Sequence, residues 1–237
     1  MLDANLKAQL QTYLQNLKST VELAVFLDEG LKSKELNALA IEIAAMSPLI
    51  NLVELDGSSE RAPSMLVRSV QNNTEIRFAG VPMGHEFTSL IMALLHSGGH
   101  PIKLDKEIIE QVRSLEGEFQ FETYISLSCQ NCPDVVQALN MMAAINPQIT
   151  NVMIDGSVFS EEVYSRDVLS VPAVYLNGEA FSQGRISISD ILKKVDVNAE
   201  KNQATMIDNK EAFDLLVIGG GPAGAASAIY SARKGIK

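Results

Sequence analysis

The hexapeptide Ser128-Cys129-Gln130-Asn131-Cys132-Pro133 contains both cysteines of this 237-residue chain. An apolar run at residues 119–127 precedes it and predicts a strand, and the periodicity that follows predicts a helix opened by Cys129 and extending to about residue 145. A thiol at a helix N-terminus lies near free backbone N–H groups and the positive end of the helix dipole, and both favour its thiolate. Pro133 falls in the first turn, where its missing N–H is tolerated.

The spacing of Cys129 and Cys132 suits thiol–disulfide exchange, which needs one thiolate that attacks a disulfide and a second thiol that resolves the mixed disulfide. Half of a zinc site and a pair of inert core thiols are the alternatives. Zinc favours four ligands, but the chain has no second cysteine pair, and its three histidines stand at no ligand spacing to this one. A redox pair is therefore the favoured interpretation, and no metal is expected.

Hydropathy periodicity and turn residues predict alternating helices and strands before residue 196. Helices are predicted at residues 2–17, 34–46, 86–96, 104–115, 129–145, 161–168 and 187–195. Strands are predicted at residues 21–27, 51–55, 63–70, 74–79, 119–127, 149–154, 172–176 and 179–181. This alternation is typical of an α/β fold.

The predicted elements occur in two similar series, about one hundred residues apart. Residues 21–27 align with residues 121–127, and Pro63 matches Pro172. The first series has Glu29-Gly30-Leu31-Lys32 where the cysteines would stand. We therefore expect two tandem folds fused into one unit, of which the first is a scaffold without redox chemistry.

The end of the chain carries a different pattern. A polar, charged stretch predicts a linker, and the apolar residues 215–218 predict a strand followed by a glycine-rich loop and a helix. In a dinucleotide-binding loop Gly219 would allow the tight turn, Gly221 the approach of a pyrophosphate and Gly224 close helix–strand packing. One strand and one helix cannot bury their own apolar faces, so we expect the opening of a Rossmann-like FAD domain, without FAD binding by this segment alone. The expected divisions are residues 1–100, 101–196, 197–213 and 214–237.

Composition limits the classes of partner. The net charge of −10 disfavours binding to nucleic acid and to anionic membranes. No apolar run approaches the roughly 18 residues of a membrane span. The first residues lack the basic and apolar regions of a signal peptide, and a single C-x-x-C fits a reducing compartment, so a cytoplasmic location is expected.

The order strand, C-x-x-C, helix and then Val171-Pro172 before a strand resembles the thioredoxin superfamily. The resemblance implies a cis peptide at Pro172 that faces the disulfide and presents the backbone of Val171 to a partner chain. Thioredoxins carry a buried Asp six residues before the first Cys, but Thr123 stands there in this chain, and Glu122 should point to the other face of its strand.

If an acid serves the cysteines, it must come from elsewhere in the chain. Glu86, within Gly84-His85-Glu86-Phe87 at the start of an apolar helix, is the candidate proton acceptor. The alternative is an ordinary acidic residue in the first turn of a helix, where it faces the helix dipole.

These motifs together resemble the N-terminal part of the flavoprotein subunit of bacterial alkyl hydroperoxide reductase, cut shortly after the start of its FAD domain. The resemblance implies that electrons pass from NADH to FAD, then to a C-x-x-C in the flavin domain, then to the Cys129–Cys132 pair and finally to a peroxiredoxin. It also implies that Cys129 attacks and Cys132 resolves. It implies a disulfide oxidoreductase that meets the flavin reductase domain of the same longer protein and does not itself oxidise NADH. It also implies a monomer, because the family's dimer contacts are expected in the missing part.

Two other functions remain open at this point. The first is a free-standing, glutaredoxin-like protein disulfide oxidoreductase, against which the linker and the glycine-rich segment argue. The second is a redox-inert docking module whose groove binds a peptide strand. A gain of two thiols on reduction would argue against the docking module.

Overall fold

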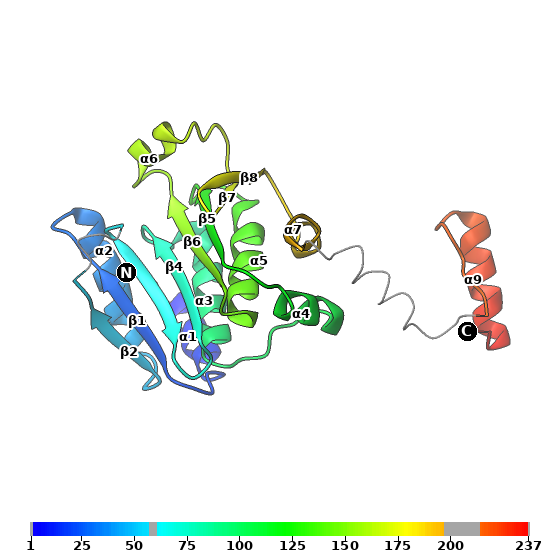
Figure 1. Ribbon diagram of the computed structural model, residues 1–237. Coiled ribbons are helices and arrows are strands. Elements are labelled where there is room, and N and C mark those ends of the chain that lie inside the picture. The colour runs from blue at the N-terminus through cyan, green and yellow to red at the C-terminus, as the bar shows by residue number, and fades with distance from the viewer. Residues whose placement is uncertain (1, 57–60, 197–213, 237) are drawn as a thin grey trace. The chain divides into compact units, whose positions relative to one another are not determined.

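The computed structural model describes residues 2–56, 61–196 and 214–236. They belong to two compact units, Met1–Val195 and Asp196–Lys237 (Figure 1). The linker expected at residues 197–213 lies outside the described residues.

The first unit contains all the strands of the described chain. Its helices are α1 (Ala4–Leu14), α2 (Leu31–Ala44), the 3-10 turn η1 (Gly84–Glu86), α3 (Phe87–Ser97), α4 (Lys106–Arg113), α5 (Cys132–Ile145), α6 (Ser160–Ser165) and α7 (Ile188–Val195). Its strands are β1 (Val21–Phe26), β2 (Ile50–Glu54), β3 (Ser64–Ser69), β4 (Thr74–Ala79), β5 (Phe119–Ile125), β6 (Ile149–Asp155), β7 (Ala173–Leu176) and β8 (Glu179–Gln183).

All eight strands join in one sheet, in the order β2-β1-β3-β4-β6-β5-β7-β8. In the first half β1 pairs parallel with β2 and antiparallel with β3, and in the second half β5 pairs parallel with β6 and antiparallel with β7. The halves meet where β4 runs parallel to β6. This repeated order confirms the prediction of two thioredoxin-like folds fused into one unit.

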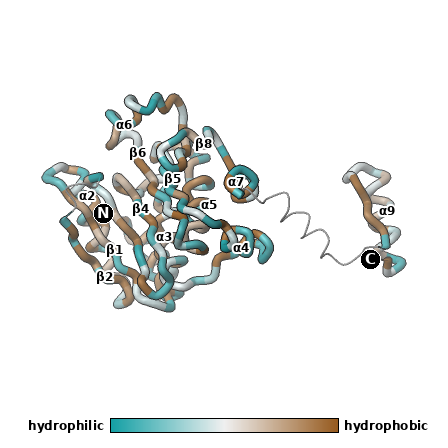
Figure 2. Tube along the Cα trace, viewed as in Figure 1, coloured by the Kyte–Doolittle hydropathy of each residue, from teal (hydrophilic) through white to brown (hydrophobic). Residues whose placement is uncertain are grey.

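One hydrophobic core runs through both halves on one face of the sheet. It holds the inward-facing residues of the strands together with residues of α2, α3, α5 and α7. Helix α3 of the first half packs against α5 of the second half, so the core is continuous across the junction. The apolar colouring in Figure 2 follows these strands and helices. On the opposite face a smaller core lies beneath α6, around Tyr124 and Ile154.

Several boundaries differ from the predicted ones by two or three residues, and two differences concern the functional motifs. Helix α5 begins at Cys132 and not at Cys129, because a helix opened by Cys129 would place Pro133 in its interior, where the ring clashes with a carbonyl and removes a hydrogen bond. Residues 215–218 form no strand, since the described residues of the second unit offer no other strand to pair with. Helix α9 (Pro222–Lys234) follows the glycine-rich loop as predicted.

Among the described residues, the helices are too short or too polar to cross a membrane.

Candidate functional site

Cys129 and Cys132 form a disulfide, with their Cα atoms 5.5 Å apart. Cys132 is the first residue of α5 and is fully buried, whereas Cys129 lies in the preceding turn and is only partly buried. The backbone N–H of Cys129 donates to the carbonyl of Ser126 at 2.9 Å, which closes that turn. Access is therefore unequal: an incoming sulfur can reach Cys129, while Cys132 is shielded behind it.

The segment between α6 and β7 comes close to this disulfide. The Val171-Pro172 peptide bond is cis, and the carbonyl oxygen of Val171 lies 3.9 Å from Sγ of Cys129. Pro172 is buried, Val171 is partly buried and Leu169 is 90% exposed. The backbone of Val171 and the accessible sulfur thus stand side by side. A cis peptide also precedes β3, at Ala62-Pro63 in the first half.

Glu86 is a fully buried carboxylic acid at the end of η1. The Ser89 hydroxyl donates to its Oε2 at 2.7 Å, and its Oε1 has no hydrogen-bond partner among the described residues. Burial raises the pKa of Glu86 to about 7, against the hydrogen bond from Ser89, which lowers it. Asp155, another buried acid, instead accepts hydrogen bonds from the backbone and hydroxyl of Ser157. Glu86 can therefore gain and lose a proton near neutral pH, and its Oε1 is free to accept a hydrogen bond or a proton.

Glu86 belongs to the first half but lies next to the second half, because the backbones of the two halves approach each other closely here. The N–H of His85 donates to the carbonyl of Leu127 at 3.2 Å. Gly84 has a φ of +59°, and a Cβ atom there would lie 2.8 Å from that same oxygen, so the approach requires glycine. Element η1 also packs against α5, the helix that Cys132 begins.

A hydrogen-bond chain connects Glu86 to α5. The side-chain amide of Gln137 donates to the Ser89 hydroxyl at 3.3 Å, and Ser89 donates to Glu86. Sequence reasoning missed both neighbours. Ser89 stands one helical turn after Glu86, a spacing that could have been noticed. Gln137 had no such signal, because its place depends on how α3 packs on α5.

The position six residues before Cys129 is buried but uncharged. Thr123 donates from its hydroxyl to Oδ1 of Asn151 at 3.0 Å, and Asn151 donates to Oδ1 of Asn140 at 2.8 Å. Glu122 points to the opposite face of the sheet, as predicted, where it pairs with arginines. Strand β5 therefore supplies no acid to the disulfide.

Comparisons with known proteins identify relatives along the whole chain. The thioredoxin domain family matches residues 120–196. The AhpF protein of alkyl hydroperoxide reductase from Pseudomonas putida is 57% identical over 237 residues, which cover 100% of this chain and 45% of that protein. The NTD N/C domain of the alkylhydroperoxide reductase AhpF from Enterococcus faecalis superposes with a TM-score of 0.75 and 28% identity, covering 82% of this chain and 100% of that one.

Over its whole length the chain is similar to the N-terminal part of AhpF. It spans less than half the length of the curated AhpF relatives that it matches. A protein disulfide oxidoreductase from Aeropyrum pernix shares the fold, with a TM-score of 0.72 at 24% identity over 85% of this chain and 96% of that one.

The glycine-rich loop lies in the second compact unit. Gly219 has a φ of +105°, and Gly221 is the N-cap of α9. A Cβ atom on Gly224 would lie 2.1 Å from the carbonyl oxygen of Gly219, so the loop folds tightly onto the first turn of the helix. These residues fit the phosphate-binding loop of a dinucleotide site, in which free backbone N–H groups at a helix N-terminus face the pyrophosphate.

Proposed function

We propose that this chain carries electrons by thiol–disulfide exchange from the flavin reductase part of a longer AhpF protein to a two-cysteine peroxiredoxin. The observation that carries the proposal is the unequal access of the two sulfurs, with Cys129 reachable beside the Val171 carbonyl and Cys132 buried behind it. This arrangement suits an attacking thiol and a resolving thiol.

The first step joins the two proteins. In the reduced chain, the Cys129 thiolate attacks one sulfur of the oxidised partner's disulfide, and the other partner sulfur leaves as a thiolate and takes up a proton. The position of Cys129 in the turn just before α5 should favour its thiolate, because the positive end of the helix dipole lies there. The backbone of Val171, held by Pro172, would pair with the partner segment as a short added strand.

The second step releases the partner. The Cys132 thiol gives its proton to the Glu86 carboxylate, and the resulting thiolate attacks Sγ of Cys129. The second partner sulfur leaves as a thiolate and is protonated, so the partner gains two electrons and the chain regains its Cys129–Cys132 disulfide. Burial suits Glu86 to this role, because a carboxyl with a pKa of about 7 is a stronger base than an exposed one.

NADH and FAD enter this scheme through the longer relatives. When bound, a flavin would supply the electron pair that reduces the Cys129–Cys132 disulfide. Gly219, Gly221 and Gly224 would form the loop that approaches its pyrophosphate. We propose that this chain alone neither binds FAD nor oxidises NADH, works as a monomer, and acts in the cytoplasm, where reductants keep such pairs active.

The test measures electron transfer directly. The chain is reduced with dithiothreitol, desalted and mixed in a stopped-flow instrument with an oxidised bacterial two-cysteine peroxiredoxin. We expect stoichiometric formation of peroxiredoxin thiols with the wild-type chain and none with Cys129→Ser. If the wild-type chain reduces insulin disulfides but leaves the peroxiredoxin oxidised, the proposal fails and the free-standing oxidoreductase takes its place.

A further inference from the structure

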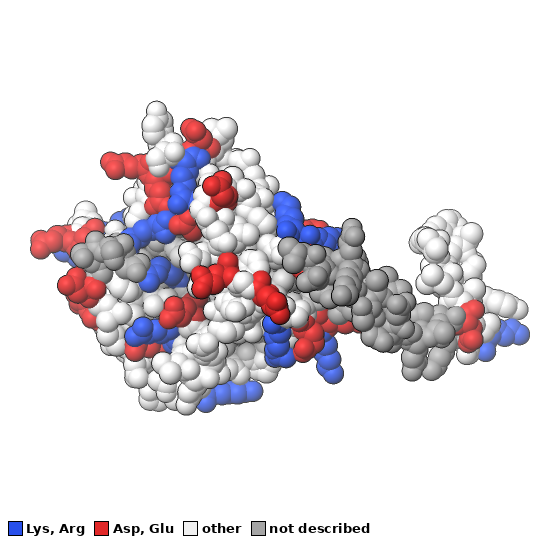
Figure 3. All heavy atoms as spheres, viewed as in Figure 1, with Lys and Arg blue, Asp and Glu red and all other residues white. Residues whose placement is uncertain are grey.

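Arg61 of the first half crosses to the second half on the sheet face opposite the main core. Its guanidinium donates from Nε to Glu162 Oε2 at 2.9 Å and from one terminal nitrogen to Glu162 Oε1 at 2.5 Å. The same nitrogen donates to Glu122 Oε1 at 2.5 Å. Glu162 lies on α6 and Glu122 on β5, so one arginine joins three segments. Acidic and basic side chains lie side by side around α6 in Figure 3.

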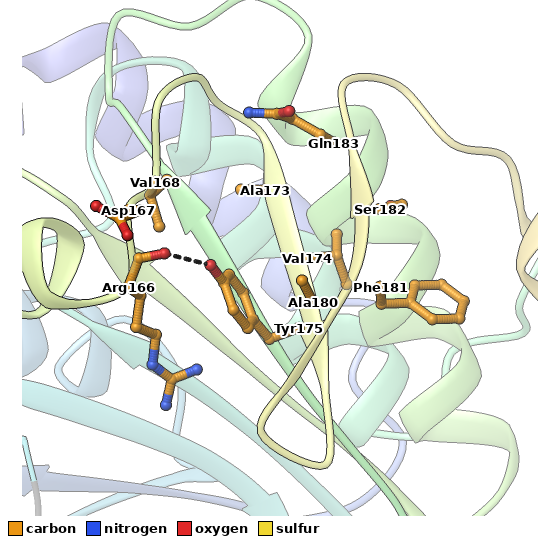
Figure 4. A pocket seen from close by; sticks show the side chains of 10 residues that line it. All are labelled: Arg166, Asp167, Val168, Ala173, Val174, Tyr175, Ala180, Phe181, Ser182 and Gln183. Atoms are coloured by element: carbon orange, nitrogen blue, oxygen red, sulfur yellow. Dashed lines mark hydrogen bonds between the residues drawn. The ribbon is translucent and has the colours of Figure 1, made fainter.

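Arg166 continues this network toward the disulfide. Its guanidinium donates to Glu122 Oε2 at 2.7 Å and lies 4.9 Å from the ring centroid of Tyr175. The Tyr175 hydroxyl donates to the Arg166 carbonyl at 2.8 Å, the bond drawn in Figure 4. Tyr124, the residue of β5 beneath this cluster, donates to Glu162. Both the side chain and the backbone of Arg166 are therefore fixed.

The segment that begins at Arg166 leads to the reactive sulfur, and we call residues 166–171 the docking loop. It starts in the network just described and ends at Val171, whose carbonyl lies 3.9 Å from Sγ of Cys129. In between, the N–H of Val168 donates to the carbonyl of Val163 at 3.1 Å, while Leu169 is 90% exposed. The loop is thus held at Arg166 and Val168, exposes the apolar side chain of Leu169 to solvent, and ends beside the reactive sulfur at Val171.

A hollow of about 400 Å³ borders this loop on the side of the β7–β8 hairpin (Figure 4). Small side chains, those of Ala173, Ala180 and Ser182, form part of its lining, together with Val168 from the loop. The docking loop and the hollow together offer a protein partner a larger contact surface than the disulfide alone.

We propose that Arg61, contributed by the half without cysteines, is a positioning residue that holds the docking loop in place for the protein partner. This inference rests on the proposed function, because it concerns how the oxidised peroxiredoxin is bound before exchange. The occupant to which we assign the loop is the peroxiredoxin segment that carries the disulfide.

Charge explains why Arg61 is needed. Glu122 and Glu162 are both partly buried, with side chains 18% and 24% exposed, and Arg61 lies between them. Without its guanidinium the two carboxylates repel each other, and Arg166 is left to pair with Glu122 alone. We expect α6 and the docking loop to loosen while the disulfide, on the other side of β5, keeps its geometry.

The first half offers a matched control. Glu22 of β1 corresponds to Glu122 in the repeat, and it pairs with Arg68 of β3, Nε to Oε1 at 2.8 Å. This pair stays within the first half. Arg68→Met removes the ion pair with Glu22, the residue that matches Glu122 in the repeat. It leaves the docking loop unchanged.

The test compares a protein disulfide with a small one. Reduced full-length chain, as wild type, Arg61→Met, Arg68→Met and Leu169→Ser, is mixed with increasing oxidised peroxiredoxin, and separately with 5,5′-dithiobis(2-nitrobenzoic acid). We expect Arg61→Met and Leu169→Ser to raise the peroxiredoxin concentration for half-maximal rate roughly five- to tenfold, with little change in the maximal rate. The rate with the small disulfide should stay within about twofold of wild type for all variants, and Arg68→Met should match wild type throughout.

Each other outcome overturns the inference. If Arg61→Met keeps the wild-type concentration dependence, Arg61 does not position the loop. If it slows the small disulfide as much as the protein, Arg61 supports the whole site and not docking. If Leu169→Ser, which removes no core contact, behaves as wild type, the loop is not the contact surface. If the wild-type chain fails to reduce peroxiredoxin at all, the proposed function falls, and this inference with it.

Discussion

The two halves place different residues just before the helix that follows their first strand. Cys129 stands three residues before the first residue of α5, and Asp28 stands three residues before the first residue of α2, next to Glu29, which matches Cys129 in the sequence repeat. The Asp28 carboxylate accepts hydrogen bonds from the Ser33 hydroxyl at 2.5 Å and from the N–H of Gly30 at 2.8 Å, and these bonds hold its pKa below the usual range. The start of α2 thus stabilises a carboxylate, and we propose that the start of α5 favours the Cys129 thiolate in the same way.

The halves also differ in what each gives to the other. The second half holds the sulfurs, but Glu86 on the inner face and Arg61 on the outer face come from the first. We therefore expect the chemistry of the second half to depend on side chains of the half without cysteines.

Glu86→Gln should have the largest effect. It removes the base that accepts the Cys132 proton, so we expect release of the partner to slow at least about 100-fold. The ratio of wild-type to variant rates should rise with pH and level off above pH about 7, where Glu86 is ionised. Stopped-flow rates from pH 5.5 to 8.5 measure it, with Glu116→Gln as an exposed control. A constant ratio across this range would remove Glu86 from proton transfer.

The same substitution should change how stability depends on pH. A buried carboxyl whose pKa is raised to about 7 stabilises the fold below its unfolded pKa, and that stabilisation is lost as pH rises through 7. The oxidised wild-type chain should therefore lose on the order of 3 kcal/mol from this group between pH 4 and pH 9, and Glu86→Gln should not. Urea unfolding at several pH values measures the difference. Parallel curves for both proteins would contradict the burial argument.

Ser89→Ala should shift the ionisation of Glu86 by a smaller amount. The hydroxyl donates to the carboxylate and lowers its pKa, so its loss should raise the pKa of Glu86 further. We expect the midpoint of the pH–rate profile to move up by roughly one pH unit. Thr88→Ala, at the exposed neighbouring position, is the control. A midpoint that moves down, or equally in both variants, would contradict this assignment.

Asp28→Asn should have the smallest effect, and only on stability. Replacing this exposed carboxylate by a neutral amide should lower the free energy of unfolding by roughly 0.5 kcal/mol at pH 7, because solvent screens its charge. Because the pKa of Asp28 is lowered in the fold, this stabilisation exists above its unfolded pKa and disappears as pH falls through the lower folded value. Unfolding at pH 7 and pH 3 measures it, with exposed Glu29→Gln as the control. A similar loss in both variants would mean that general charge, and not Asp28, matters.

Much of the fold follows from local sequence signals. Alternating hydropathy and the matching prolines Pro63 and Pro172 predict the repeat, and the order of strands in the sheet agrees with it. Helix α5 begins three residues after its predicted start, because Pro133 fits only the first turn of a helix. Residues 215–218 looked like a strand, but apolar residues alone do not make one without a neighbouring strand.

The parts of the site that are formed by residues close together in the sequence could be predicted. The cysteines lie within one motif, whereas Gln137 approaches Ser89, and Arg61 approaches Glu162, only through packing of the two halves. Hydropathy periodicity does not reveal contacts between residues that lie 48 and 101 positions apart in the sequence, as these pairs do. Glu86 was found as a candidate from its motif, but its burial and its free oxygen became visible only in the fold.

The most direct test of the division between the two sulfurs is to trap the intermediate. Cys132→Ser cannot resolve a mixed disulfide, so the reduced variant mixed with oxidised peroxiredoxin should accumulate a one-to-one covalent complex. Peptide mass spectrometry should find the partner sulfur on Cys129, and the reverse variant, Cys129→Ser, should form no complex because Cys132 is buried. A complex through Cys132, or none with either variant, would contradict the account.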